Sequence, residues 1–150
     1  MTRKWNVPLT YEPKIEPVRN GTCTQTIRPG RKYAVGDLIR FYVWEGRPYR
    51  SKRKTITEYA RIEATFPITI FPLGITFRDH SFDKYFYPQC DHRFDDNKAL
   101  AWNTFGLTKL AESDGIIPPT GNALRGVLIK KNGPIPDEGM DAQIIRWVPK

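Results

Sequence analysis

The chain has little cysteine and no long hydrophobic run. Two cysteines, Cys23 and Cys90, among 150 residues are too few for a disulfide framework, so we expect free thiols in a reducing compartment. No apolar stretch approaches the roughly 20 residues that a membrane-spanning helix needs. Residues 1–6 are polar and basic and precede no apolar segment of the kind found in secretory signals. The sequence therefore predicts a cytoplasmic protein without a membrane partner.

Several motifs with well-known chemistry are also missing. The sequence contains no glycine-rich phosphate loop, no HExxH, no CxxC and no Ser-His-Asp order. Cys90 lies close to His80 and His92 in the sequence, but Cys-x-His is not a zinc-knuckle spacing. A structural zinc site needs four ligands of defined geometry. We therefore expect neither a metal nor a cofactor.

Positive charge is abundant and concentrated in the first part of the chain. The formal net charge is +8. Residues 1–61 hold 14 Lys and Arg against 5 Asp and Glu, whereas the rest of the chain holds 10 against 11. Such a concentration predicts a face that contacts phosphate or another polyanion. The plain alternative is a well-solvated surface.

Length and patterning predict one domain of the α+β class. A chain of 150 residues is long enough for one hydrophobic core, and 13 prolines and 11 glycines favour strands and loops over long helices. We expect helices at 13–20 and 103–112. The expected strands are 5–10, 24–27, 38–44, 55–66, 68–77, 124–130 and 142–148.

The strongest strand pattern belongs to a hairpin with a basic tip. Residues 38–44 and 55–66 alternate in polarity as half-buried strands do. Cations and aromatic residues interleave around the tip, a composition that suits single-stranded nucleic acid, where bases stack and phosphates pair with cations. The cations are Arg47, Arg50, Lys52, Arg53 and Lys54, and the aromatic residues are Tyr42, Trp44 and Tyr49.

A short motif before the hairpin resembles a known family. Gly21, Thr26 and Arg28 match the signature Gly-x-Lys-x-x-Glu/Thr-x-Arg, and the turn at 35–37 and the helix end at 111–115 match further. The chain thus resembles an ASCH domain of the PUA-like superfamily over residues 1–62 and 104–150, with an insertion at about 64–103. The resemblance implies a small β-barrel with short helices at one mouth, and a polar cleft there.

The resemblance also implies two functions for that cleft. The first is binding of RNA, another single-stranded nucleic acid or a modified nucleoside, with Gly21 and Arg28 lining the cleft. The second is hydrolysis of N4-acylated cytidine nucleosides or of RNA. Hydrolase members use a threonine, a lysine and an acid, which fall here on Thr26, Cys23 and Asp114. Because cysteine replaces the lysine, the nucleophile would be Thr26 with another base, or Cys23 as a thiolate.

Simpler roles remain open for each of these residues. Cys23 has the properties of a small buried hydrophobe. Arg28 could form a structural ion pair with Asp114 or Asp37, and Asp114 could serve only as a local turn residue. A third function is a protein-interaction module, including a homodimer, that uses an aromatic patch in the insertion. That patch comprises Phe82, Tyr85, Phe86 and Tyr87.

Overall fold

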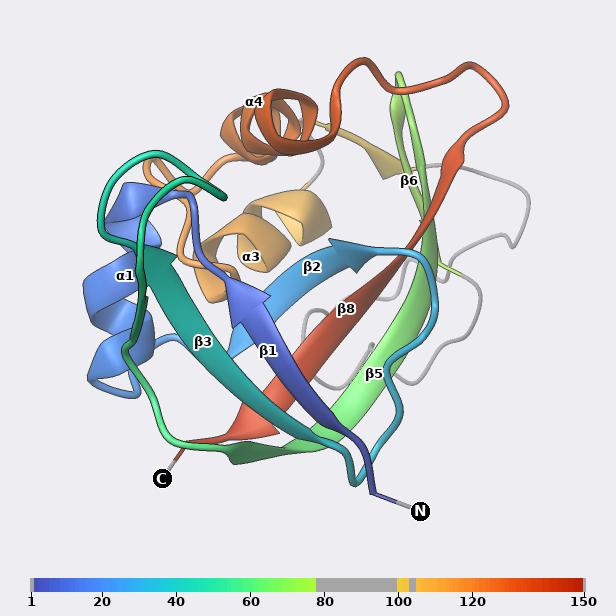
Figure 1. The fold of residues 1–150 in the computed structure, drawn as a ribbon. Coiled ribbons are helices and arrows are strands. Elements are labelled where there is room, and N and C mark those ends of the chain that lie inside the picture. The colour runs from blue at the N-terminus through green and yellow to red at the C-terminus, as the bar shows by residue number, and fades with distance from the viewer. Residues whose placement is uncertain (1, 78–99, 103–104, 150) are drawn as a thin grey trace.

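The computed structural model describes residues 2–77, 100–102 and 105–149 and confirms the α+β class (Figure 1). These residues form eight strands in one sheet, together with three helices. The strands are β1 (Lys4–Pro8), β2 (Gln25–Pro29), β3 (Leu38–Trp44), β4 (Arg53–Thr55), β5 (Ala60–Phe71), β6 (Gly74–Phe77), β7 (Leu100–Ala101) and β8 (Met140–Val148). The helices are α1 (Glu12–Arg19), α3 (Phe105–Ser113) and α4 (Gly121–Asn132).

The sheet is strongly curved but open. β1 lies parallel to β3, and β3 is antiparallel to β4 and β5. β5 pairs along most of its length with β8, which in turn pairs with β2. Figure 1 shows these strands curving around one another, yet β1 and β2 at the two ends share no ladder among the described residues. The predicted barrel closure is therefore not confirmed.

The hydrophobic core has two parts, on either side of β2 and β8. Alternate residues of a strand face opposite sides of a sheet, so Ile27 and Ile144 face one side while Thr26 and Ile145 face the other. The first part packs α3 and α4 against β5, β6 and β8, and the second lies among α1, β1, β3, β5 and β8. Ile27 of β2 belongs to the first part of the core, so α3 and α4 share a core with the strand that carries Arg28.

Most of the predicted elements are confirmed. The strand at 38–44 coincides with β3, and the helix at 13–20 corresponds to α1. Residue 20 caps α1 through its amide, and Gly21 follows with φ of 83°, a left-handed conformation that glycine adopts without strain. The hairpin tip is confirmed by the pairing of β3 with β4, but the second strand is interrupted between β4 and β5.

The predicted strand at 124–130 is wrong, because these residues belong to α4. Leu124 and Leu128 are buried at a helical spacing of four, and the Thr120 side chain caps the helix by accepting a hydrogen bond from the Ala123 amide. The β-branched residues Val127 and Ile129 favoured a strand locally. Packing of Leu124 and Leu128 in the core outweighs that preference.

The predicted insertion at about 64–103 begins inside the sheet. Its first part forms the second half of β5 and β6, which contribute Phe66, Ile68 and Ile75 to the core. Its aromatic patch, both histidines and Cys90 lie outside the described residues, and the insertion itself stays a prediction. No helix in the described part of the chain is long and apolar enough to cross a membrane.

Candidate nucleic-acid interface

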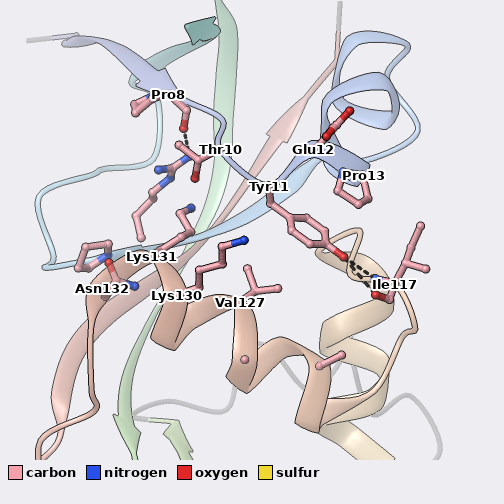
Figure 2. A pocket seen from close by; sticks show the side chains of 14 residues that line it. Pro8, Thr10, Tyr11, Glu12, Pro13, Ile117, Val127, Lys130, Lys131 and Asn132 are labelled. Carbon is pink, nitrogen blue, oxygen red and sulfur yellow. Dashed lines mark hydrogen bonds between the residues drawn. The ribbon is translucent and has the colours of Figure 1, made fainter. Parts of the chain in front are cut away.

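A pocket lies between the β1–α1 connection, the end of β2 and one face of α4. Its volume is about 850 Å³. Three cations line it, namely Arg28, Lys130 and Lys131, and Glu12 is its one acidic lining residue. Figure 2 shows the amino groups of Lys130 and Lys131 pointing from α4 toward the connection that carries Thr10 and Tyr11. The pocket is therefore suited to an anionic ligand.

Arg28 lines this pocket, and among the described residues its guanidinium makes one hydrogen bond. The residue is 8% exposed, and its Nη2 donates a 2.7 Å hydrogen bond to the Pro8 carbonyl oxygen at the end of β1. This bond links β2 to β1, the two strands between which the sheet stays open. Its Nε is buried and has no hydrogen-bond partner among the described residues. Burial lowers the pKa of Arg28, so a ligand anion that pairs with the guanidinium would offset its desolvation.

Lys131 brings a second cation close to Arg28. The residue as a whole is exposed, since it borders an open pocket, but protein atoms crowd its ammonium. This crowding, together with repulsion from Arg28 and Lys14, lowers the pKa of Lys131 to about 7, although Asp114 opposes the shift. A bound anion would favour the charged ammonium, because an opposite charge within a few ångströms stabilises it.

A buried ion pair lies behind the pocket. The Lys14 Nζ of α1 is 3.2 Å from Asp114 Oδ2, and the two side chains are 5% and 8% exposed. Asp114 follows the end of α3, and its Oδ1 is buried without a hydrogen-bond partner among the described residues. Burial raises the pKa of the Asp114 carboxyl, whereas Lys14, Lys131 and Arg28 counteract that rise. Asp114 thus pairs with Lys14 and is not the hydrogen-bonding partner of Arg28.

Cys23 lies beside this ion pair as a buried thiol. It is 4% exposed, and its Sγ is 3.7 Å from the Ser113 carbonyl oxygen. A Cβ built on Gly115 would lie 3.2 Å from the Cys23 sulfur and 3.6 Å from the Lys14 Cγ, so the three residues converge. Burial raises the pKa of the Cys23 thiol. The environment therefore favours the neutral thiol, which is a poor nucleophile.

The other residues of the predicted cleft are not gathered at the pocket. Thr26 is 2% exposed and faces the second part of the core with Ile145, its partner on β8. Gly21 borders a smaller hollow of about 210 Å³ beside Phe41 and Trp147. Of the residues predicted to line the cleft, Arg28 alone lines the larger pocket.

The basic hairpin tip carries a stack of aromatic rings and a guanidinium. The ring centroids of Trp44 and Tyr49 are 5.2 Å apart, and the Arg53 guanidinium lies 4.6 Å from the centroid of Tyr42 and 5.1 Å from that of Trp44. Tyr49 is 85% exposed and adopts a left-handed φ of 64°. A fully exposed ring in an unfavourable backbone conformation is a candidate stacking platform for a base.

The hairpin tip and the pocket lie at the same end of the sheet. β1 ends with Pro8 opposite Tyr42, and the Leu9 amide donates to the Tyr42 carbonyl oxygen at 2.9 Å. Beyond this point β1 leads into Thr10, which lines the pocket, while β3 continues through Trp44 into the hairpin tip. Figure 1 shows the β3–β4 loop near the start of α1. Arg47, Arg50, Lys52 and Lys54 are exposed there.

Lys14, Lys130 and Lys131 were not predicted as residues of the site. Lys14 precedes Val18 by four residues, and both lie on the buried side of α1, so this spacing was an available signal. Lys130 was assigned to the end of a predicted strand at 124–130, and Lys131 follows that strand. Their role depends on α4 placing them opposite the β1–α1 connection, which no local pattern indicates.

The described residues contain no cluster of His, Cys, Asp and Glu that could hold a metal ion. No family model, curated protein or solved structure matches this chain. The resemblance to ASCH domains therefore rests on the motif at 21–28 and on the turns that follow it.

Proposed function

We propose that this protein binds single-stranded RNA or a nucleotide-like ligand, with the α4 pocket holding one nucleotide and the hairpin tip holding the adjoining backbone. The observation that carries this proposal is the set of cations lining the pocket, which have no acidic partner within salt-bridge distance among the described residues. They lie at the same end of the sheet as the exposed aromatic and basic loop. An ASCH-type relationship to the PUA-like superfamily is part of the same proposal.

In this proposal, cations of the pocket and of the hairpin tip bind phosphates, and aromatic rings of the hairpin tip stack on bases. Cations that neutralise phosphates supply affinity that depends on salt but not on sequence. Stacking of a base on an exposed ring such as Tyr49 contributes about 1–3 kcal/mol and tolerates any base. The pocket volume is within the range of about 300–1,000 Å³ that small-molecule sites occupy, which supports a ligand of the size of one nucleotide. Single-stranded RNA supplies both kinds of group at once.

Hydrolysis is the second candidate, and one observation favours it. Lys14 places an ammonium beside Asp114, so the chain has a lysine next to the acid although Cys23 occupies the motif position. Against catalysis, Thr26 and Cys23 are 2% and 4% exposed, and neither lines the larger pocket. We expect no turnover of N4-acetylcytidine or of RNA. Turnover by the wild type that Thr26→Ala or Cys23→Ala abolishes would replace binding with hydrolysis as the function.

The binding function is tested by the salt dependence of RNA affinity. Arg50 and Lys52 are exposed at the hairpin tip, so their replacement by glutamine does not disturb the core. If each contacts one phosphate, Arg50→Gln/Lys52→Gln lowers the slope of log K against log salt by about 1.4, because each contact on a single strand contributes about 0.7. Isothermal titration calorimetry at several salt concentrations measures this slope.

The chain offers a matched control for charge alone. Arg3 and Arg61 are exposed and lie at the opposite end of β3, since the Leu38 amide donates to the Arg3 carbonyl and Leu38 pairs with Arg61. Arg3→Gln/Arg61→Gln removes the same net charge as the hairpin variant. We expect the control to keep the wild-type slope. Equal slopes in both double variants would contradict the hairpin contact, and no RNA binding at low salt would contradict the proposed function.

A further inference from the structure

Two of the cations that line the pocket, Arg28 and Lys131, lie close enough to repel each other. Arg28 lies on β2 and Lys131 on the last turn of α4, far apart in sequence, and their mutual repulsion is one cause of the lowered pKa of Lys131. Two like charges held together in a folded protein disfavour each other unless a third group neutralises them. No described acid forms a salt bridge with either residue. Asp114 is engaged by Lys14.

The Arg28 guanidinium is almost completely enclosed, so a ligand can approach only a small part of it. Its Nη2 is fixed to the Pro8 carbonyl oxygen, its Nε has no partner among the described residues, and the residue is 8% exposed. At its other end the pocket is bounded by the Tyr11 hydroxyl, which donates to the Ile117 carbonyl and accepts from the Ile117 amide at 3.2 and 3.0 Å. Figure 2 shows Pro8 at one end of the pocket and Tyr11 beside Ile117 at the other, with α4 beneath them.

These features favour a terminal phosphate of an RNA over a phosphodiester in the middle of the RNA. A phosphate monoester carries about two negative charges near neutral pH, which match two cations, whereas a diester carries one. A monoester also has a single ester substituent, so it can approach a guanidinium that is almost completely enclosed. Planar bidentate contacts to phosphate are a common use of arginine.

We infer that Arg28 and Lys131 bind a terminal phosphate monoester, so that the pocket takes the phosphorylated terminal nucleotide of a single-stranded RNA. This inference rests on the proposed RNA-binding function and adds the end group that the pocket selects. The same chemistry occurs in a free nucleoside monophosphate, which is the second source of such a group. The hairpin tip would then hold the nucleotides that follow the terminal one.

A pH profile distinguishes this role from a structural one. The charged groups that face Lys131 are Arg28 from β2, Lys14 from α1 and Asp114 after α3, and Glu12 and Lys130 share the pocket. The monoester gains its second charge near pH 6, and Lys131 loses its charge near pH 7. Affinity for the phosphorylated end is therefore highest between these values. In Lys131→Gln the loss of affinity above about pH 7 disappears.

The test compares RNAs of about eight nucleotides, within the length that one small domain covers, with a 5′-phosphate, a 3′-phosphate or two hydroxyl ends. Adenosine 5′-monophosphate and uridine 3′-monophosphate serve as free nucleotides. We expect one phosphorylated end to bind about tenfold more tightly than the hydroxyl RNA, and Lys131→Gln to remove this preference. Arg125→Gln, on the exposed side of α4 and outside the pocket lining, is the matched control and keeps it.

The outcomes separate the terminal-phosphate site from the proposed RNA-binding function. Equal affinity for all three RNAs overturns the terminal-phosphate site and leaves RNA binding intact. A preference that survives in both Lys131→Gln and Arg28→Lys, with both variants folded by circular dichroism, also overturns the site. If no RNA binds but a monophosphate binds and Lys131→Gln abolishes it, the phosphate site holds and the RNA function fails. If neither binds, both fail.

Discussion

Breaking the buried ion pair behind the pocket should destabilise the protein strongly. Lys14→Met keeps the aliphatic stem of the side chain but removes the ammonium 3.2 Å from Asp114 Oδ2. Removing one member of a buried pair costs about 3–5 kcal/mol, because the remaining charge stays buried without its partner. Arg28 and Lys131 still attract the Asp114 carboxylate, so we expect about 3 kcal/mol. For a chain of this size that corresponds to a Tm lower by roughly 6–12 °C.

The loss should also depend on pH. Without Lys14, the pKa of Asp114 in the folded variant rises above its wild-type value, because the main counter-charge is gone. The folded variant then binds a proton more readily than the unfolded chain, so its stability falls as the pH rises through that folded pKa. Urea unfolding should therefore show a larger deficit relative to wild type at about pH 8 than at about pH 5.

A double-mutant cycle separates the ion pair from packing. Lys14→Met/Asp114→Asn leaves no unpaired carboxylate, so it should recover most of the stability that Lys14→Met loses. Asp114→Asn alone leaves three cations close together and should be destabilised as well. A loss below about 1 kcal/mol in Lys14→Met, or a double variant whose loss equals the sum of the single losses, would show that the two buried side chains are not coupled.

Three further predictions concern the pocket, Asp37 and Cys23. A Cβ on Gly126 meets nothing within 4 Å, so Gly126→Phe should fill the pocket and abolish nucleotide binding in calorimetry, whereas Gly126→Ala should bind normally and raise helix stability by up to about 1 kcal/mol. Burial would raise the pKa of Asp37, but hydrogen bonds from the Trp5 indole and two backbone amides lower it. Its contribution to stability is therefore present above about pH 4 and lost as the pH falls through the folded pKa, and Asp37→Asn should flatten that acid limb in urea titrations. The Cys23 thiol should resist a disulfide reagent in the folded protein and react only on unfolding, and fast modification of native protein would contradict its burial.

Local patterns in the sequence were sufficient for much of the sheet. The alternation over 38–44 predicted β3, with Ile39 and Phe41 buried on its apolar face, although Tyr42 on the other face is buried as well. The basic hairpin tip was equally visible, since its cations and aromatic residues are neighbours in the chain. The curvature of the sheet depends on pairing between distant strands, and its two open edges are linked by the bond from Arg28 to the Pro8 carbonyl. No window of sequence contains such a contact.

The candidate site was predicted only in part, for the same physical reason. Arg28 was singled out by its position in a motif, but its partner is a carbonyl group on another strand. The resemblance places the motif's lysine at Cys23, whereas the lysine that pairs with Asp114 in the structure is Lys14, which α1 brings there. Lys131 reaches the pocket because residues 121–132 form a helix, whereas a strand was predicted at 124–130. Charged residues that cluster through tertiary packing leave no periodic signal in the chain.

Crosslinking of bound RNA tests the central claim most directly. Single-stranded RNA that carries 4-thiouridine is irradiated with the wild-type protein, and the modified peptides are identified by mass spectrometry. We expect adducts at the hairpin tip around Trp44 and Tyr49 and along the pocket lining between α4 and the β1–α1 connection. Adducts confined to the opposite end of β3, around Arg3 and Arg61, would contradict this prediction, as would the absence of any adduct under low-salt conditions.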